Sequence, residues 1–271
     1  MRLAAALFLL LCAGAPAASE PQLRGEWEQG GVIFGSVQPG TRVWLNDQPL
    51  RVTPGGEFVL GLDRDEPAEV TLRLQPPGAP APLERRYPVR KRQYLIQRLQ
   101  LPPSMVNPPP ETLARIRREQ QKITAARERD SALTAFTESF IWPTVGPISG
   151  VFGSQRILNG EPKQPHYGVD VAVPTGTPVV APAGGIVSLA EPDLYYTGGT
   201  VMIDHGHGLS SAFLHLSRLH VQAGQTVKQG DLIGEVGATG RATGAHLDWR
   251  INWFGRRVDA QKLVPPMPEQ N

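Results

Sequence analysis

Two short stretches of the chain carry side chains that can bind a metal ion. Residues 166–170 read HYGVD, and residues 244–252 read GAHLDWRIN. Alternate side chains of a strand point the same way, so His166, Gly168 and Asp170 are expected to share one face. A histidine nitrogen and an aspartate oxygen are ordinary zinc ligands, and the glycine between them leaves space above the sheet. This spacing is typical of a metal with an exposed coordination position.

The second stretch alternates in the same way and extends the polar face. Its apolar side is predicted to hold Leu247, Trp249, Ile251 and Trp253, and its polar side His246, Asp248, Arg250 and Asn252. The sequence SAFLHLS predicts a third strand, with Phe213 and His215 opposite Ala212, Leu214 and Leu216. If the three strands are neighbours, five side chains converge on one groove: His166, Asp170, His215, His246 and Asp248.

Each of these residues also has a plainer interpretation. A single histidine in a β protein is more often a satisfied polar residue than a ligand, and we interpret His205, His207 and His220 in this way because turn sequence lies in or beside them. Asp248 can simply pair with Arg250 on its own face. Tyr195 and Tyr196 lie in a predicted loop, where packing is favoured over donation to a reaction intermediate. For the five converging residues together, coincidence is a poor explanation.

The elements that position these residues are expected to be mainly β. The chain has 29 glycines and 27 prolines in 271 residues, which favours short strands and turns over long helices. Residues 137–263 are predicted to form an antiparallel β domain with a groove. Residues 20–101 read as a small β-sandwich-like accessory domain, in which Val43 and Leu45, then Val70, Leu72 and Leu74, alternate with polar residues.

Between the two domains, residues 102–136 are predicted to be a Pro-rich linker and a basic helix. Leu113, Ile116, Ile123, Leu133 and Phe136 fall near one stripe of that helix, opposite a charged face. A solvated face is the favoured interpretation of the charges, and attraction to an anionic envelope surface is a weaker one. Residues 264–271 are predicted to be a tail.

The first nineteen residues have the layout of a secretory signal peptide, with an apolar run at 3–11 followed by small residues. Cys12 is the only cysteine, so cleavage would leave a chain without disulfides or thiolate ligands. We therefore expect an exported protein of a bacterial periplasm, with no stable membrane span after cleavage. A net charge of +2 gives no field that calls for nucleic acid.

Residues 138–262 resemble the lysostaphin- or LytM-type zinc metalloendopeptidases that cut peptide bonds in bacterial peptidoglycan. The resemblance rests on HYGVD, GTPVVAPAGGIV, GTVMIDHGHG and FLHLSRLHVQAGQTVKQGDLIGEVGATGRATGAHLDW, which occur in the family's order and spacing. It implies one zinc ion held by His166 and Asp170, with a third ligand at position 248. It also implies that His215 and His246 act on the bound water and the oxyanion, without saying which does which. A signal peptide and a small β domain ahead of the catalytic domain are similar to members of this family in Gram-negative bacteria, which implies a Gram-negative envelope.

Position 248 departs from the family pattern, because the motif reads His246-Leu247-Asp248 where the family has H-x-H. Aspartate remains a competent zinc ligand. Two carboxylates formally neutralise a divalent cation, so the metal should be a weaker Lewis acid and the site should accept harder metals such as manganese. We expect a working but shifted site that needs a higher pH or tolerates other metals.

Two functions from different classes follow. The first is a zinc-dependent endopeptidase that hydrolyses the peptide cross-links of peptidoglycan, with the peptide stems as its partner. The second is a catalytically degenerate LytM-type protein that binds and activates a cell-wall amidase. Four of five family positions are intact and the fifth can still bind metal, which favours the enzyme.

Overall fold

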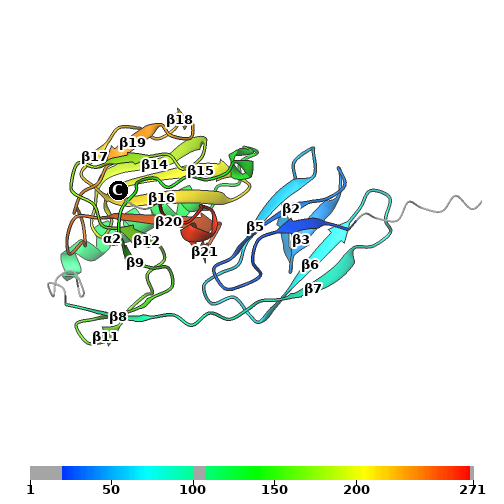
Figure 1. The fold of residues 1–271 in the computed structure, drawn as a ribbon, viewed down its shortest axis with the longest axis horizontal. Coiled ribbons are helices and arrows are strands. Elements are labelled where there is room, and N and C mark those ends of the chain that lie inside the picture. The colour runs from blue at the N-terminus through cyan, green and yellow to red at the C-terminus, as the bar shows by residue number, and fades with distance from the viewer. Residues whose placement is uncertain (1–19, 101–107, 269–271) are drawn as a thin grey trace, which may run out of the picture.

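A computed structural model describes residues 20–100 and 108–268. The predicted signal peptide, residues 101–107 of the predicted linker and the last three residues of the predicted tail lie outside this range. Two β domains lie side by side, and an extended segment passes from the first along the second (Figure 1). Within the described residues, no helix is long and apolar enough to cross a membrane.

The first domain is built from two antiparallel sheets. One sheet has the order β1-β2-β5, formed by Gln22–Arg24, Val32–Ser36 and Glu57–Gly61. The other has the order β4-β3-β6-β7, formed by Gln48–Leu50, Arg42–Leu45, Glu69–Gln75 and Leu83–Pro88. The predicted alternation is confirmed, because Val43 and Leu45 on β3 and Val70, Leu72 and Leu74 on β6 are all buried.

The second domain is organised around one eight-stranded sheet. Its path runs β18-β14-β15-β16-β20-β12-β9, and β21 pairs with β20. In that order the strands are Thr226–Val227, Gly185–Leu194, Gly198–Gly206, Leu209–Leu216, Leu247–Trp253, Val169–Val171, Ile148–Gly150 and Arg256–Val258. Neighbouring strands are antiparallel throughout, as the sequence predicts.

Two small sheets flank this central sheet. One has the order β13-β19-β17, formed by Pro178–Val180, Leu232–Glu235 and Arg218–Leu219. The other has the order β11-β10-β8, formed by Glu161–Pro162, Gln155–Leu158 and Ile96–Leu99. Strand β8 pairs in parallel with β10, so the segment that leaves the first domain becomes part of the second.

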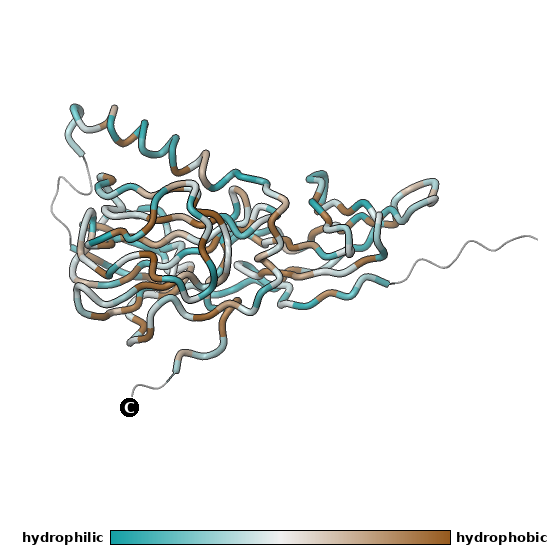
Figure 2. The backbone as a smooth tube through the Cα atoms, turned by 90° about the horizontal axis from the view of Figure 1, so that it is seen from above, coloured by the Kyte–Doolittle hydropathy of each residue, from teal (hydrophilic) through white to brown (hydrophobic). Residues whose placement is uncertain are grey.

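Helix α2, Leu113–Arg127, lies along one side of the second domain (Figure 2). The short 3-10 helix η1, Pro110–Thr112, precedes it, and η2, Ala135–Thr137, and η3, Ala260–Lys262, lie elsewhere in the chain. The prediction that the helical stripe includes Leu133 and Phe136 is wrong, because the helix ends at Arg127. Ile123 packs on a small cluster formed by Ala126, Leu189, Leu194, Met202, Ala212 and Leu214.

The sheet therefore has a core face and a face covered in part by α2. Leu247, Trp249, Ile251 and Trp253 of β20 are all buried in the main core, as their alternation predicts. The intervening residues of β20 lie on the opposite face. That opposite face carries the side chains whose chemistry the sequence singles out.

Candidate metal centre and active-site groove

Strand register brings the two predicted carboxylates together. Asp170 of β12 lies directly opposite Asp248 of β20 in the antiparallel pair. Side chains that face each other in this way have Cβ atoms about 5 Å apart, and two like charges there repel. Ligand atoms of His166, Asp170 and Asp248 lie within 4.8 Å of one another, and all three residues are buried. The predicted convergence of these three residues is thus present in the fold.

Two glycines make the room in which the carboxylates sit. A Cβ atom at Gly168 would lie 2.3 Å from Oδ1 of Asp248, and one at Gly150 would lie 2.2 Å from Oδ2 of Asp170. Both separations are shorter than any real contact of a Cβ atom. The glycine in HYGVD therefore accommodates the close approach of Asp248 rather than leaving open space.

Two atoms at the centre of the cluster lack hydrogen-bond partners. Nε2 of His166 lies 3.1 Å from Oδ1 of Asp170, yet both atoms are buried and without a hydrogen bond in the described structure. Nε2 of His246 lies 3.8 Å from the same aspartate oxygen. Buried polar atoms without partners are costly, and a divalent cation bound between them would satisfy both.

Two arginines neutralise the carboxylates. Arg250 donates from Nε to Oδ1 of Asp248 at 2.9 Å and from Nη2 to Oδ2 at 2.6 Å. Arg156 lies 3.6 Å from Asp170 and donates to Nδ1 of His166 at 2.8 Å. Burial alone would raise the pKa of Asp248, but the charge of Arg250 holds that pKa well below its usual range. Two negative charges therefore meet two positive charges.

The donor set fits a divalent metal, provided that the contacts of Arg156 and Arg250 with it give way. His166 and Asp170 offer free atoms that face each other, and Asp248 is the third oxygen donor. Because an arginine can only donate, Nδ1 of His166 accepts and Nε2 carries the ring proton. A metal at Nε2 would displace that proton and shift Arg156, and a metal at Asp248 would loosen Arg250. Metal binding and the arginine contacts thus compete.

The two remaining predicted residues form a pair beside this cluster. The rings of His215 and His246 have centroids 4.8 Å apart. Nδ1 of His215 donates to the carbonyl of Thr239 at 2.8 Å, and Nδ1 of His246 donates to the carbonyl of Gly244 at 2.9 Å. Since a carbonyl only accepts, each ring carries its proton on Nδ1 and keeps an unprotonated Nε2.

His215 reaches the groove through a break in the strand. The prediction that it shares a face with Phe213 is wrong, because strict alternation would have put it in the core. His215 has φ of 64°, in the left-handed region that is unusual for a residue other than glycine. Phe213 and Leu216 belong to the main core, while His215 lines the groove. Burial lowers the pKa of His215 to about 4, so the ring is neutral at pH 7.

A cleft of about 220 Å³ opens over the cluster. Its lining residues are Gln97, Leu99, Ser149, Arg156, Leu158, Asp170, Ala172, His215, Arg241, Ala242, Thr243, Gly244, Ala245 and His246. Gln97 and Leu99 come from β8 and Arg156 from β10. Sequence reasoning missed these residues, because no local pattern shows that the interdomain segment pairs with β10.

The remaining histidines and the two loop tyrosines form hydrogen bonds or pack against neighbours, which agrees with their plainer interpretation. His205 is buried between the carbonyl of Gly184 and the hydroxyl of Ser211. His207 contacts the carbonyl of Arg51, and His220 contacts Glu235. Tyr195 and Tyr196 pack edge to face, and the guanidinium of Arg241 lies 4.5 Å from the ring of Tyr196. Neither tyrosine lines the cleft.

Known proteins resemble this chain, most clearly in its second domain. The profile of peptidase family M23 matches residues 164–260. A crystal structure of a Pseudomonas aeruginosa protein assigned to peptidase M23 has a TM-score of 0.68 and 32% identity, and covers 88% of this chain and 94% of that one. Peptidoglycan DD-endopeptidase ShyA of Vibrio cholerae is 43% identical over 103 residues. Peptidoglycan DD-endopeptidase ShyB of the same organism is 39% identical over 138 residues.

The curated relatives are matched over part of their length only. The segment shared with ShyA is 38% of this chain and 24% of ShyA, and the segment shared with ShyB is 51% of this chain and 30% of ShyB. The Pseudomonas structure, in contrast, is matched over nearly its whole chain, including the first domain.

Proposed function

The chain belongs to peptidase family M23, and we propose that it is a metal-dependent endopeptidase that hydrolyses peptide cross-links of peptidoglycan. One observation supports this most directly. Nε2 of His166 and Oδ1 of Asp170 face each other at 3.1 Å, buried and without hydrogen bonds, beside a pair of histidines at the floor of a cleft. The names of the endopeptidases ShyA and ShyB support the choice of substrate.

Metal binding and proton transfer are assigned to two different sets of residues. His166, Asp170 and Asp248 would hold the metal, which when bound would polarise a water molecule and the scissile carbonyl. His215 and His246 each present an unprotonated Nε2 to the cleft, fixed by a backbone carbonyl at Nδ1. One of them would take a proton from the attacking water and return it to the leaving amine. The other could donate to the developing oxyanion only after its own Nε2 has gained a proton.

Zinc is the proposed metal, with tolerance of other divalent ions because two of the three ligands are carboxylates. The proposed location is the periplasm of a Gram-negative envelope, where the peptide stems of peptidoglycan are the partner. The named relatives from Vibrio cholerae support that setting.

The arginine contacts point to a second candidate. Arg250 occupies both oxygens of Asp248, and Arg156 occupies Nδ1 of His166, so the charges balance without a metal. A protein that kept this arrangement would bind cell-wall hydrolases, such as an amidase, without hydrolysing peptides itself. The relatives named as endopeptidases give no support to this alternative.

Incubation with purified cross-linked muropeptides and added zinc, followed by mass spectrometry, tests the proposal. We expect cleavage by the wild type and its loss in His246→Ala and in Asp248→Ala. His220→Ala is the matched control, because His220 contacts Glu235 outside the cleft, and it should cleave normally. A folded wild-type protein that cleaves nothing at any zinc concentration would contradict the proposal and leave the second candidate.

A further inference from the structure

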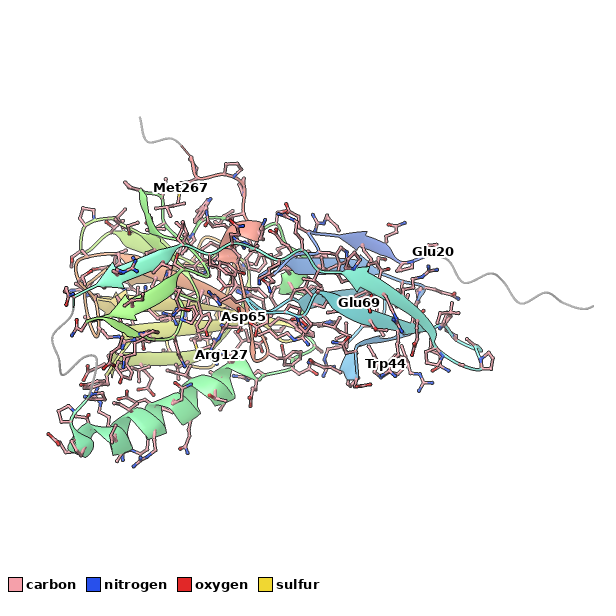
Figure 3. All side chains as sticks on the ribbon, turned by 90° about the horizontal axis from the view of Figure 1, so that it is seen from below. Glu20, Trp44, Asp65, Glu69, Arg127 and Met267 are labelled. Carbon is pink, nitrogen blue, oxygen red and sulfur yellow. The ribbon has the colours of Figure 1, made fainter. Side chains whose placement is uncertain are left out.

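A second cleft lies on the same face of the sheet as the active-site groove. It encloses about 190 Å³ between α2 and strands β15, β16, β20 and β21. Three arginines line it: Arg127 from the last turn of α2, Arg250 from β20 and Arg257 from β21. Figure 3 labels Arg127 at the end of α2, against the second domain. No acidic residue is among the described residues that line this cleft.

Two of the three positive charges of this arginine cleft have no carboxylate partner within the part of the chain that the structure describes. The third, Arg250, pairs with Asp248. Among residues 20–100 and 108–268, Arg127 and Arg257 form no ion pair, and Nε of Arg127 is buried without a hydrogen bond. Arg257 donates to the amide oxygen of Asn252 and lies 5.3 Å from the centre of the Tyr167 ring.

Burial and mutual repulsion both act against these charges. Burial, with the neighbouring charge of Arg250, lowers the pKa of Arg127 to about 10. Burial, with the charges of Arg127 and Arg250, lowers the pKa of Arg257 to about 9. Two unpaired guanidinium groups held beside the paired Arg250 in a half-buried cleft cost free energy unless a further anion joins them. Guanidinium groups favour a planar oxyanion, which they bind with two parallel hydrogen bonds.

The arginine cleft lies close to the active-site groove along strand β20. Arg250 is two residues from Asp248 on β20, so the arginine cleft begins about 7 Å along the strand from the candidate metal ligand. Across the sheet, Leu214 faces Asp248 and Ala212 faces Arg250, and both of these apolar residues line the arginine cleft. The two clefts share no lining residue, and the buried Asp248 lies between them: it pairs across the sheet with Asp170, which lines the groove, and binds Arg250, which lines the arginine cleft. A peptide in the groove would have to extend about 7 Å further along the sheet to place a charged group here.

We infer that Arg127, Arg250 and Arg257 form a subsite that binds a carboxylate of the peptide held in the neighbouring groove. The assignment of the carboxylate to a substrate peptide rests on the proposed function, whereas the binding of an anion by the cleft does not. Neutral polar side chains around the arginines offer further hydrogen bonds, from Gln120, Gln164, Thr197, Thr200 and Asn252.

Calorimetric titration of the full chain, kept metal-free by a chelator so that no turnover occurs, tests this inference. The probes are a peptidoglycan stem tetrapeptide with free carboxylates, the same peptide with its carboxylates amidated, and inorganic phosphate. The wild type should bind the carboxylate peptide at least about tenfold more tightly than the amide, as expected for a charge-assisted contact. Phosphate should compete with the carboxylate peptide.

Two variants and one control locate the effect. Arg127→Gln and Arg257→Gln should each remove the preference for the carboxylate peptide. Arg117→Gln removes the same charge from an exposed position of the same helix and should keep the preference. Melting temperatures confirm that each variant is folded.

Several outcomes would overturn the inference. Equal affinity for the two peptides would do so, as would an equal loss in Arg117→Gln, which would indicate a general field rather than a site. Phosphate binding that depends on Arg127 and Arg257, with no preference between the peptides, would assign the cleft to a free anion instead. Because binding is measured without metal, a failure of muropeptide cleavage leaves this test intact.

Discussion

At the scale of single residues, Arg250 contacts both the candidate metal ligand Asp248 and the arginine cleft. Its guanidinium binds both oxygens of that aspartate and also lines the arginine cleft. A buried carboxylate that loses its partner is costly, so Asp248 needs either Arg250 or a metal. This competition sets the affinity of the site for a metal ion.

Removing Arg250 should strengthen metal binding. In Arg250→Gln both oxygens of Asp248 are freed and one repelling positive charge is lost. We expect zinc affinity to rise by about tenfold or more, in the range that groups around metal ligands usually contribute. Competition with a chromophoric chelator measures the affinity.

Arg257→Gln is the matched control for this change, because it removes a charge from the same cleft without touching Asp248. A similar gain in both variants would mean that charge alone is responsible. Unchanged affinity in Arg250→Gln would show that the arginine does not compete with the metal.

At the scale of elements, alternation predicted much of the site and failed at one residue. The buried series from Leu247 to Trp253 and the pairing of polar residues on β20 follow from period two. The face on which His215 lies could not be predicted, because its left-handed backbone interrupts the alternation of β16. A glycine would have indicated such a conformation, but the residue at this position is a histidine. The contact of β8 with β10 also escaped prediction, since parallel pairing across more than fifty residues leaves no local pattern.

A buried histidine on β15 should make the fold sensitive to acid. Burial lowers the pKa of His205 to about 4, against 6.5 in the unfolded chain. As pH falls through this interval the unfolded state takes up a proton first, so the free energy of unfolding declines. The contribution of His205 to this loss should reach about 1.6 kcal/mol between pH 6.5 and 5. Urea unfolding at several pH values measures it.

The same measurement on a variant isolates the contribution of this residue. His205→Gln should flatten the decline, because it removes the buried ring that takes up its proton first in the unfolded chain. A decline of the same size in His205→Gln would assign the acid sensitivity to other groups.

At the scale of the whole molecule, the two domains are joined by buried contacts rather than by a linker alone. Glu66 pairs with Arg256 at 3.0 Å, and Arg92 pairs with Asp259 at 2.8 Å. A Cβ atom at Gly61 would lie 2.6 Å from Cβ of Trp253, so the sheets meet closely. Strand β8 continues the chain from the first domain, pairs with β10 of the second, and supplies Gln97 and Leu99 to the wall of the groove.

The central claim is that His166, Asp170 and Asp248 form a metal site despite the two arginines. Equilibrium dialysis of the full chain against zinc, with metal counted by mass spectrometry, tests it most directly. We predict one zinc per wild-type chain, with binding lost in Asp170→Asn and weakened in Asp248→Asn. Folded wild-type protein that retains no zinc would contradict the account and assign the site to arginine–carboxylate pairs alone.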